Sequence, residues 1–170
     1  MRIKKTVKED NTKKLEKILN RLSKAKIKIG IFGSSGSEIL MIASVNEFGC
    51  NINVTPKMRA WLHYNGLHLK KSTTSIKIPE RSYIRRTVEE KQNKMDKLIK
   101  EGLNELFSFQ IEVDTLLNRI GQYLSDITKE TLTEVSSPPN HPFTIEKKGG
   151  KANPLIDTGR LRESITFKIE

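Results

Sequence analysis

The sequence of 170 residues is long enough for one domain with its own hydrophobic core, and its 35% hydrophobic and 30% charged residues are typical of a globular protein. We expect no membrane span, no signal peptide and no internal disulfide, because no apolar run is long enough and Cys50 is the single cysteine, which fits a reducing compartment. The formal net charge of +11 indicates a polyanionic or acidic partner, and most of the excess lies before residue 29.

Residues 1–25 are predicted to form a basic strand and helix. Ile3, Lys5 and Val7 alternate with polar neighbours as in a short strand, and an amphipathic helix follows. Its apolar positions have helical spacing: Leu15, Ile18, Leu19 and Leu22. Its other face carries Lys13, Lys17, Arg21 and Lys24. This face is either simply solvated or neutralises DNA phosphates, and the sequence leaves both interpretations open because no aromatic residues are interleaved.

A strand, a glycine turn and a helix are predicted between residues 26 and 49. Alternating isoleucines in residues 27–31 favour a strand with one buried face. Ser35 and Glu38 have the spacing of a capping box at the start of a helix, and Gly49 is placed to end that helix. We expect this unit to belong to the core.

Residues 56–72 are predicted to form an inserted β-hairpin. Apolar and polar residues alternate before Asn65 and Gly66, a pair typical of a two-residue type I′ turn. That register places His63 opposite His68, half of a metal site at most, since no carboxylate or thiol lies at ligand spacing. An exposed polar hairpin face is the simpler interpretation, and we expect no bound metal.

The second half of the chain is predicted to contain a long antiparallel helix pair. One helix follows Pro79 and continues to about Phe107, with Gly102 allowing either a bend or close packing, and a second begins near Asp114. Residues 136–153 form an extended loop rich in Pro, Gly and Lys. Asp157 or Thr158 then caps one helical turn before a last strand over residues 165–169, whose loss should be harmful.

The predicted fold class is therefore α+β, in one domain over residues 1–170. It has a small, mostly antiparallel sheet packed against a long helix pair, with the inserted hairpin and the extended loop as additions.

No motif predicts catalysis. Ser164, His141 and Asp157 supply the residue types of a hydrolase triad, but no nucleophile elbow surrounds the serine. The glycines at positions 30, 33 and 36 fit turn geometry better than a phosphate loop. We expect a protein that is not an enzyme and has no cofactor.

Three islands in fixed order carry a family resemblance. They are residues 39–49, ending in Asn-Glu-Phe-Gly, residues 78–85, with Ile-Pro-x-Arg, and residues 154–165, with Asp-Thr-Gly-x-Leu. Together they resemble the tail-completion or minor tail component family of long-tailed bacteriophages. The resemblance covers the chain from about residue 27 to its end.

The resemblance implies a virion protein of the neck, assembled in the host cytoplasm, that joins the tail tube to the head connector as a ring of identical subunits, with a hexamer favoured. Implied partners are the connector or adaptor and the tail terminator or tube proteins, with non-specific genomic DNA as a further contact and no membrane. A tail terminator and a basic nucleic-acid-binding protein are the alternatives.

Physical reasoning from these motifs suggests how they act. Asn46 and Glu47 are expected to pair with Arg81 or Arg85, within one subunit or across a ring contact. The loop of residues 136–153 is the segment expected to reach across to a neighbouring subunit. The residues expected at an interface are Asn46, Glu47, Arg81, Arg85, His141, Phe143, Lys147, Lys148, Asp157 and Arg160. Those expected to line a DNA channel are Lys13, Lys17, Arg21 and Lys24.

Overall fold

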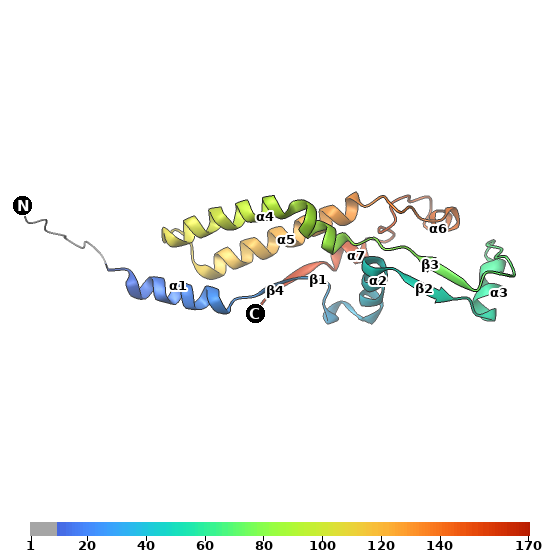
Figure 1. Ribbon diagram of the computed structural model, residues 1–170, viewed down its shortest axis with the longest axis horizontal. Coiled ribbons are helices and arrows are strands. Elements are labelled where there is room, and N and C mark those ends of the chain that lie inside the picture. Colours follow the sequence, from blue (N-terminus) through green and yellow to red (C-terminus); the bar gives the residue numbers. More distant parts are fainter. Residues whose placement is uncertain (1–9) are drawn as a thin grey trace, which may run out of the picture.

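The computed structural model describes residues 10–170, and the strand predicted at Ile3 to Val7 lies outside them. The elements in chain order are α1 (Thr12–Lys24), β1 (Ile27–Gly30), the 3-10 turn η1 (Gly33–Ser35), α2 (Ser37–Phe48), β2 (Cys50–Asn53), α3 (Pro56–Tyr64), β3 (Ser75–Ile78), α4 (Tyr83–Phe107), α5 (Val113–Glu134), α6 (Pro142–Lys147), α7 (Arg160–Glu163) and β4 (Thr166–Ile169). The molecule is elongated, with α1 at one end and α3 and α6 at the other (Figure 1). The α+β class is confirmed.

Helices α4 and α5 form the predicted long pair, and they lie side by side along the long axis of the molecule (Figure 1). Gly102 of α4 is buried against the Leu116 side chain of α5, so the glycine serves close packing. Asp114 lies in the first turn of α5, and Glu112 occupies the N-cap position that the prediction gave to Asp114. The buried residues of one core cluster lie here and on α1: Ile18, Leu106, Val113, Leu116, Leu117 and Ile120.

Strand β4 pairs antiparallel with β1, so the last predicted strand is tied to the first. The register sets Ile27 opposite Ile169 and Ile29 opposite Phe167. Both strands pack on α5, where Gly121 leaves room for the Phe167 ring. This two-stranded sheet therefore covers one side of the helix pair.

Helix α2 packs into a second core cluster beside the first turn of α4. Its predicted capping box is wrong: Gly36, with φ of +91°, is the N-cap, and Ser35 belongs to the preceding 3-10 turn. Gly49 ends the helix with φ of +69°, as predicted. The buried members of this cluster are Ile39, Ala43, Tyr83, Leu132, Val135, Leu155, Leu161 and Ile165.

The predicted hairpin over residues 56–72 is wrong, because Pro56–Tyr64 is a helix. The Thr55 hydroxyl accepts a hydrogen bond from the Met58 amide at 3.1 Å and Pro56 occupies the first turn, which together start α3. Asn65 donates its side-chain amide to the Trp61 carbonyl at 2.9 Å, so Asn65 and Gly66 end a helix. The antiparallel ribbon that does form consists of β2 and β3. We call this ribbon, together with the residues between its two strands, the arm (residues 50–78).

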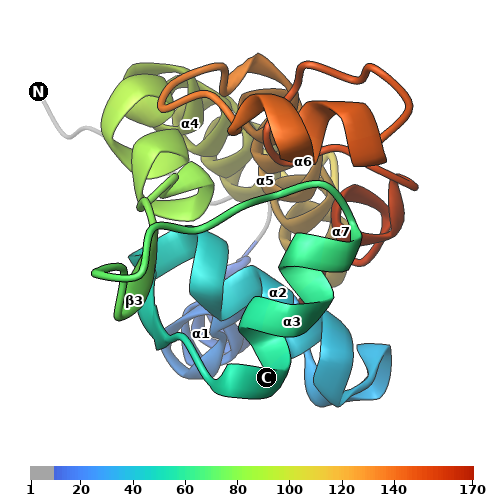
Figure 2. The same ribbon diagram turned by 90° about the vertical axis from the view of Figure 1, so that its right-hand side faces the viewer.

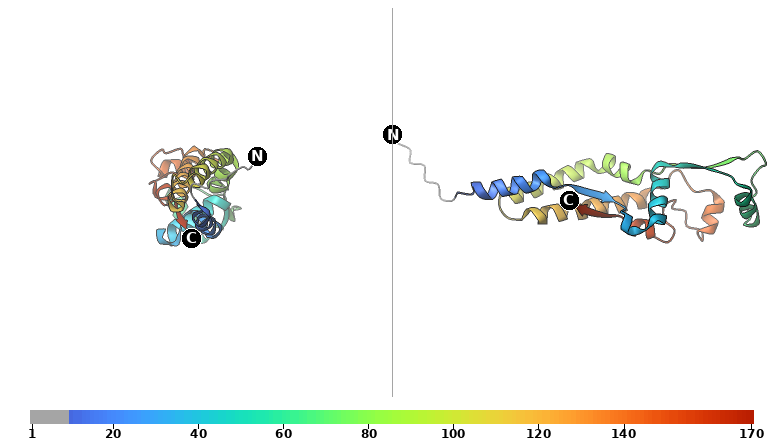
Figure 3. Two further views of the ribbon diagram at one scale, coloured as in Figure 1. Left: turned by 90° about the vertical axis from the view of Figure 1, so that its left-hand side faces the viewer. Right: turned by 90° about the horizontal axis from the view of Figure 1, so that it is seen from below.

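The arm projects from the body of the molecule, and α3 lies at its tip (Figure 1, Figure 3). Seen end-on, α3 and α6 lie near each other at this end (Figure 2). The predicted extended loop of residues 136–153 is corrected in part, since it contains the short helix α6. Across residues 10–170, none of the helices combines the length and hydropathy needed to cross a bilayer.

Candidate interaction site

Glu47 joins the end of α2 to the beginning of α4. The side chain is only 4% exposed, and its two carboxylate oxygens accept hydrogen bonds from the Ile84 amide at 3.0 Å and the Arg85 amide at 3.1 Å. These are orphan amides of the first turn of α4, where the helix dipole favours a negative charge. One helix is therefore capped by a carboxylate from another.

Arg85 completes this junction. Its guanidinium donates to the Glu47 carboxylate at 3.2 Å, to the Glu47 carbonyl at 2.6 Å and to the Glu80 carboxylate at 2.8 Å. The hydrogen bond to Glu47 and the nearby carboxylates raise the pKa of Arg85 despite some desolvation. The expected pairing of Glu47 with Arg85 is thus confirmed inside one subunit.

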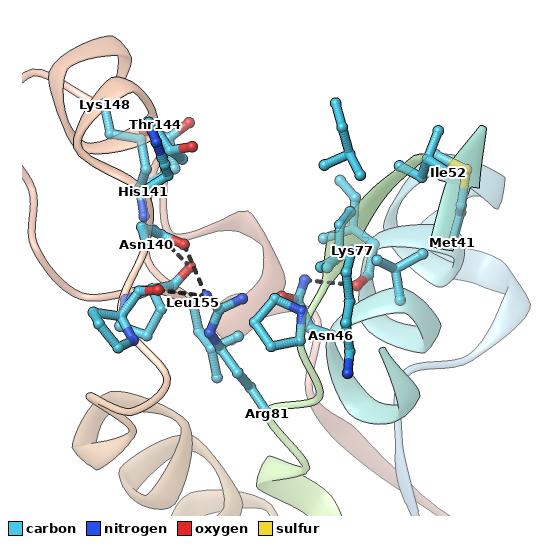
Figure 4. Close-up of a pocket in the computed structure, with 18 residues that line it drawn as sticks. Met41, Asn46, Ile52, Lys77, Arg81, Asn140, His141, Thr144, Lys148 and Leu155 are labelled. Carbon is cyan, nitrogen blue, oxygen red and sulfur yellow. Dashed lines mark hydrogen bonds between the residues drawn. The ribbon is translucent and has the colours of Figure 1, made fainter. Parts of the chain in front are cut away.

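Arg81 anchors the segment that follows α5. Its side chain is 6% exposed and donates to the Pro138 carbonyl at 2.7 Å, the Pro139 carbonyl at 3.2 Å and the Asn140 side-chain oxygen at 3.1 Å (Figure 4). Burial lowers the pKa of Arg81. Its backbone amide donates to the Asn46 carbonyl at 2.7 Å, so the expected link from Asn46 to Arg81 is made by main-chain atoms.

A groove of about 810 Å³ lies between the arm and the segment that Arg81 anchors. Lys77 and Ile52 of the arm stand on one side, and Thr144 and Lys148 stand on the other (Figure 4). Lys148 donates to the Asn153 carbonyl at 2.7 Å, and partial burial lowers the pKa of its ammonium group, opposed by Asp157. The groove wall is mainly apolar.

Two of the three residues that supply the types of a hydrolase triad make hydrogen bonds to nearby backbone atoms. Ser164 donates its hydroxyl to the Arg160 carbonyl at 2.8 Å, inside α7. His141 is the N-cap of α6, where its Nδ1 accepts from the Phe143 amide at 3.2 Å. Asp157 lies exposed at the edge of the groove. The hydroxyl and this imidazole nitrogen therefore stabilise short helices.

The remaining predicted interface residues lie toward the surface. Lys147 lies 5.5 Å from the centre of the Phe143 ring and donates to the Asn65 side-chain oxygen at 3.3 Å, which connects α6 to the arm. Arg160 pairs with Glu38 at 3.2 Å, and both side chains are more than half exposed. These groups are accessible to a neighbouring molecule, whereas Glu47 and Arg81 are buried in the subunit.

The basic face of α1 lies at the opposite end of the molecule from the arm (Figure 3). Lys13, Lys17 and Lys24 are exposed, as predicted. Arg21 is exposed as well and pairs with Asp114 of α5 at 2.9 Å, and whether this face lines a DNA channel stays a prediction.

His63 and His68 are adjacent, although the hairpin that predicted this does not exist. Their Nδ1 atoms are 2.7 Å apart, because the turn after α3 folds back through a hydrogen bond from the Leu67 amide to the Leu62 carbonyl. Within residues 10–170, no group of three or more His, Cys, Asp or Glu side chains is placed to hold a metal ion.

No family model, curated protein or solved structure matches this chain. The family resemblance therefore stays a prediction.

One surface was missed by sequence reasoning, the outer face of α3. Lys57, Trp61 and Tyr64 follow one another at i, i+4 and i+7 and are all exposed. The alternation of apolar and polar residues concealed this spacing. The signals that would have found it are Thr55 and Pro56 as a helix start and Asn65 and Gly66 as a helix end.

Proposed function

We propose that this chain is a structural, non-enzymatic protein of a bacteriophage virion, a tail-completion protein whose copies form a ring in the neck between tail tube and head connector. The observation that carries the proposal is that the three sequence islands meet in one part of the fold, the first two at a shared junction and all three in one core cluster. Glu47 of the first island caps α4, the helix that begins in the second island. The backbone amide of Arg81, in the second island, donates to the Asn46 carbonyl of the first.

The third island joins the same core. Leu155 and Leu161 pack in one cluster with Ile39 and Ala43 of the first island and Tyr83 of the second. Residues that carry the resemblance are thus the residues that build this half of the molecule, which is what a shared fold would require. A motif set scattered over unrelated surfaces would support the proposal far less.

The shape of the molecule supports assembly. The arm extends beyond the body of the molecule (Figure 1). A projecting arm that meets a different patch on the next copy makes a heterologous contact, and such contacts close into rings when the rotation permits. In this proposal the β2 and β3 ribbon of the arm and α6 make the contact together, with His141, Phe143, Lys147, Lys148, Asp157 and Arg160 at the interface. A tail terminator, which ends the tube, would use the same architecture.

The test is cryo-electron microscopy of purified phage particles containing this chain, with the chain located by mass and by fit. Ring density between the connector and the tail tube is expected. A ring at the tube end without contact to the connector would favour the terminator. Particles that lack the chain altogether would refute a virion role and favour an assembly factor or a soluble DNA-binding protein.

The exposed lysines of α1 favour one second candidate function, non-specific binding of duplex DNA. Phosphate neutralisation predicts an affinity that falls steeply as salt rises. We expect Lys17→Ser with Lys24→Ser to weaken duplex binding and flatten its salt dependence, measured by fluorescence anisotropy with a labelled duplex. An affinity that does not change between low and moderate salt would exclude this electrostatic mode.

A further inference from the structure

The outer face of α3 presents one lysine and two large aromatic side chains to solvent. Lys57, Trp61 and Tyr64 share one face of the helix, and at 1.5 Å rise per residue the three span about 10 Å. Leu62 is 7% exposed and anchors the opposite face. The tryptophan and tyrosine are therefore presented to solvent.

The charged residues of the arm are all basic. Residues 48–79 contain no aspartate or glutamate, and their basic residues are Lys57, Arg59, Lys70, Lys71 and Lys77. A surface this long without a carboxylate attracts anions and offers no counter-charge of its own.

Hydrogen bonds hold other basic residues at this end of the molecule. Arg59 donates to the carbonyls of Leu69, Lys70 and Thr73, which holds the loop carrying Lys70 and Lys71 against α3. At the other end, Lys147 of α6 donates to the Asn65 side chain, one residue beyond Tyr64. Lys57 therefore lies one turn before Trp61 on the same face, and Lys147 lies beside Asn65 at the other end of the aromatic pair.

We propose that this face binds single-stranded nucleic acid, with Trp61 and Tyr64 stacking on bases and Lys57 contacting a phosphate. Exposed rings between cations are the pattern of single-strand binding, in which every base offers a face for stacking. The core of a protein interface, by contrast, is depleted in lysine. The proposal does not depend on the neck role or on α1, which lies at the other end of the molecule.

Trp61 is the chain's one tryptophan, so its emission reports on this face alone. The experiment is a titration of the full-length chain with an unlabelled oligothymidylate at low salt, followed by tryptophan fluorescence, with a matched duplex in parallel. We expect saturable quenching by the single strand, weaker binding of the duplex, and an affinity for the single strand that falls as salt rises.

Two exposed substitutions test the two kinds of contact, and circular dichroism checks that each variant is folded. Tyr64→Ala should weaken binding roughly 5- to 150-fold, because stacking of one base contributes about 1 to 3 kcal/mol. Lys57→Ser should reduce the slope of log K against log salt by about 0.7 for a single strand. Matched controls are Phe107→Ala, a 41% exposed ring at the far end of α4, and Lys17→Ser on α1, and neither should change the quenching curve.

Three outcomes would overturn the proposal. The first is anisotropy of a labelled strand that shows binding while Trp61 emission stays constant, which would place the strand elsewhere. The second is a Tyr64→Ala variant that binds as tightly as the unaltered chain. The third is the absence of binding to any strand at low salt.

Discussion

At the scale of single residues, the junction of α2 and α4 depends on one buried carboxylate. Glu47 satisfies two orphan amides of α4 and also holds Arg85. Glu80 contacts the same guanidinium but is half exposed, so water competes for its charge. The two glutamates therefore form a matched pair for mutation.

Glu47→Gln is expected to lower the free energy of unfolding by about 2 to 3 kcal/mol, because a neutral amide accepts from two amides and a guanidinium much less strongly and brings a donor into the site. Glu80→Gln should cost less than about 1 kcal/mol. Urea unfolding followed by circular dichroism measures both. Equal losses from the two variants would contradict the capping role of Glu47.

For a substitution at Tyr83 we expect the opposite effect on the free energy of unfolding. Its hydroxyl is buried with no hydrogen-bond partner among residues 10–170, and burial together with the Glu47 charge raises the pKa of Tyr83. Tyr83→Phe should therefore leave stability unchanged or raise it by up to about 1 kcal/mol. Above about pH 10 the unfolded chain loses this proton and the folded chain keeps it, so the stability of the unaltered protein falls with pH and the advantage of Tyr83→Phe grows. Urea unfolding at pH 7 and above pH 10 checks this, and a loss exceeding about 1 kcal/mol at pH 7 would mean that the hydroxyl is bonded.

At the scale of elements, the sequence predicts regular patterns well and fails where two patterns coincide. The helices α1, α2, α4 and α5 and the strands β1 and β4 follow directly from spacing and end signals. The hairpin prediction over residues 56–72 failed because Asn-Gly ends a helix as readily as it turns a hairpin. The choice between the two structures depends on whether Leu62 alone is buried, as in this helix, or every second residue is buried, as in a strand. Burial depends on contacts that no local pattern records.

The candidate site was predictable to a similar extent. The pairing of Glu47 with Arg85 could be expected from adjacent helix ends. The three hydrogen bonds from Arg81 to residues 138–140 could not, because they depend on how the chain returns after α5. The aromatic face of α3 was hidden by the error in the type of element.

Close packing between elements gives a third prediction, at Gly121. An added Cβ there would collide with the Phe167 ring of β4, held in place by its pairing with β1. Gly121→Ala should therefore destabilise the protein by about 1 kcal/mol or more, even though alanine favours a helix by about 1 kcal/mol. The Cβ of Gly102→Ala would meet the tip of the flexible Leu116 side chain, and this variant should be milder. Thermal unfolding of both variants is the measurement, and the reverse order would refute the argument.

At the scale of the whole molecule, the arm and the body differ in how they are stabilised. The body has two buried clusters on its helix pair and sheet, whereas the arm is held chiefly by its own ribbon, by Arg59 and by the contact of Asn65 with Lys147. The elements that present Trp61 and Tyr64 are thus those that contribute least to the core. This division suits a protein whose arm serves a partner.

Replacing residues 54–74 with Asn-Gly should leave the body folded, since Asn53 and Ser75 already face each other across the ribbon. We expect the midpoint of thermal unfolding to change by less than about 4 °C. Deleting residues 166–170 should instead abolish cooperative unfolding, because β1 and α5 lose their partner. Circular dichroism during heating compares the two, and a body that fails to fold without the arm tip would show that the arm belongs to the core.

The pairing of β1 with β4 also sets the order of events during synthesis. Ile27 leaves the ribosome early, and its partner Ile169 is added only about 140 residues later, which at about 5 to 20 residues per second is a delay of roughly 7 to 28 s. The α4 and α5 hairpin closes through a short connection and can form within this interval. The nascent chain therefore carries an unpaired strand edge through most of its translation, and a ribosome that stalls before residue 166 releases a product open to aggregation along that edge.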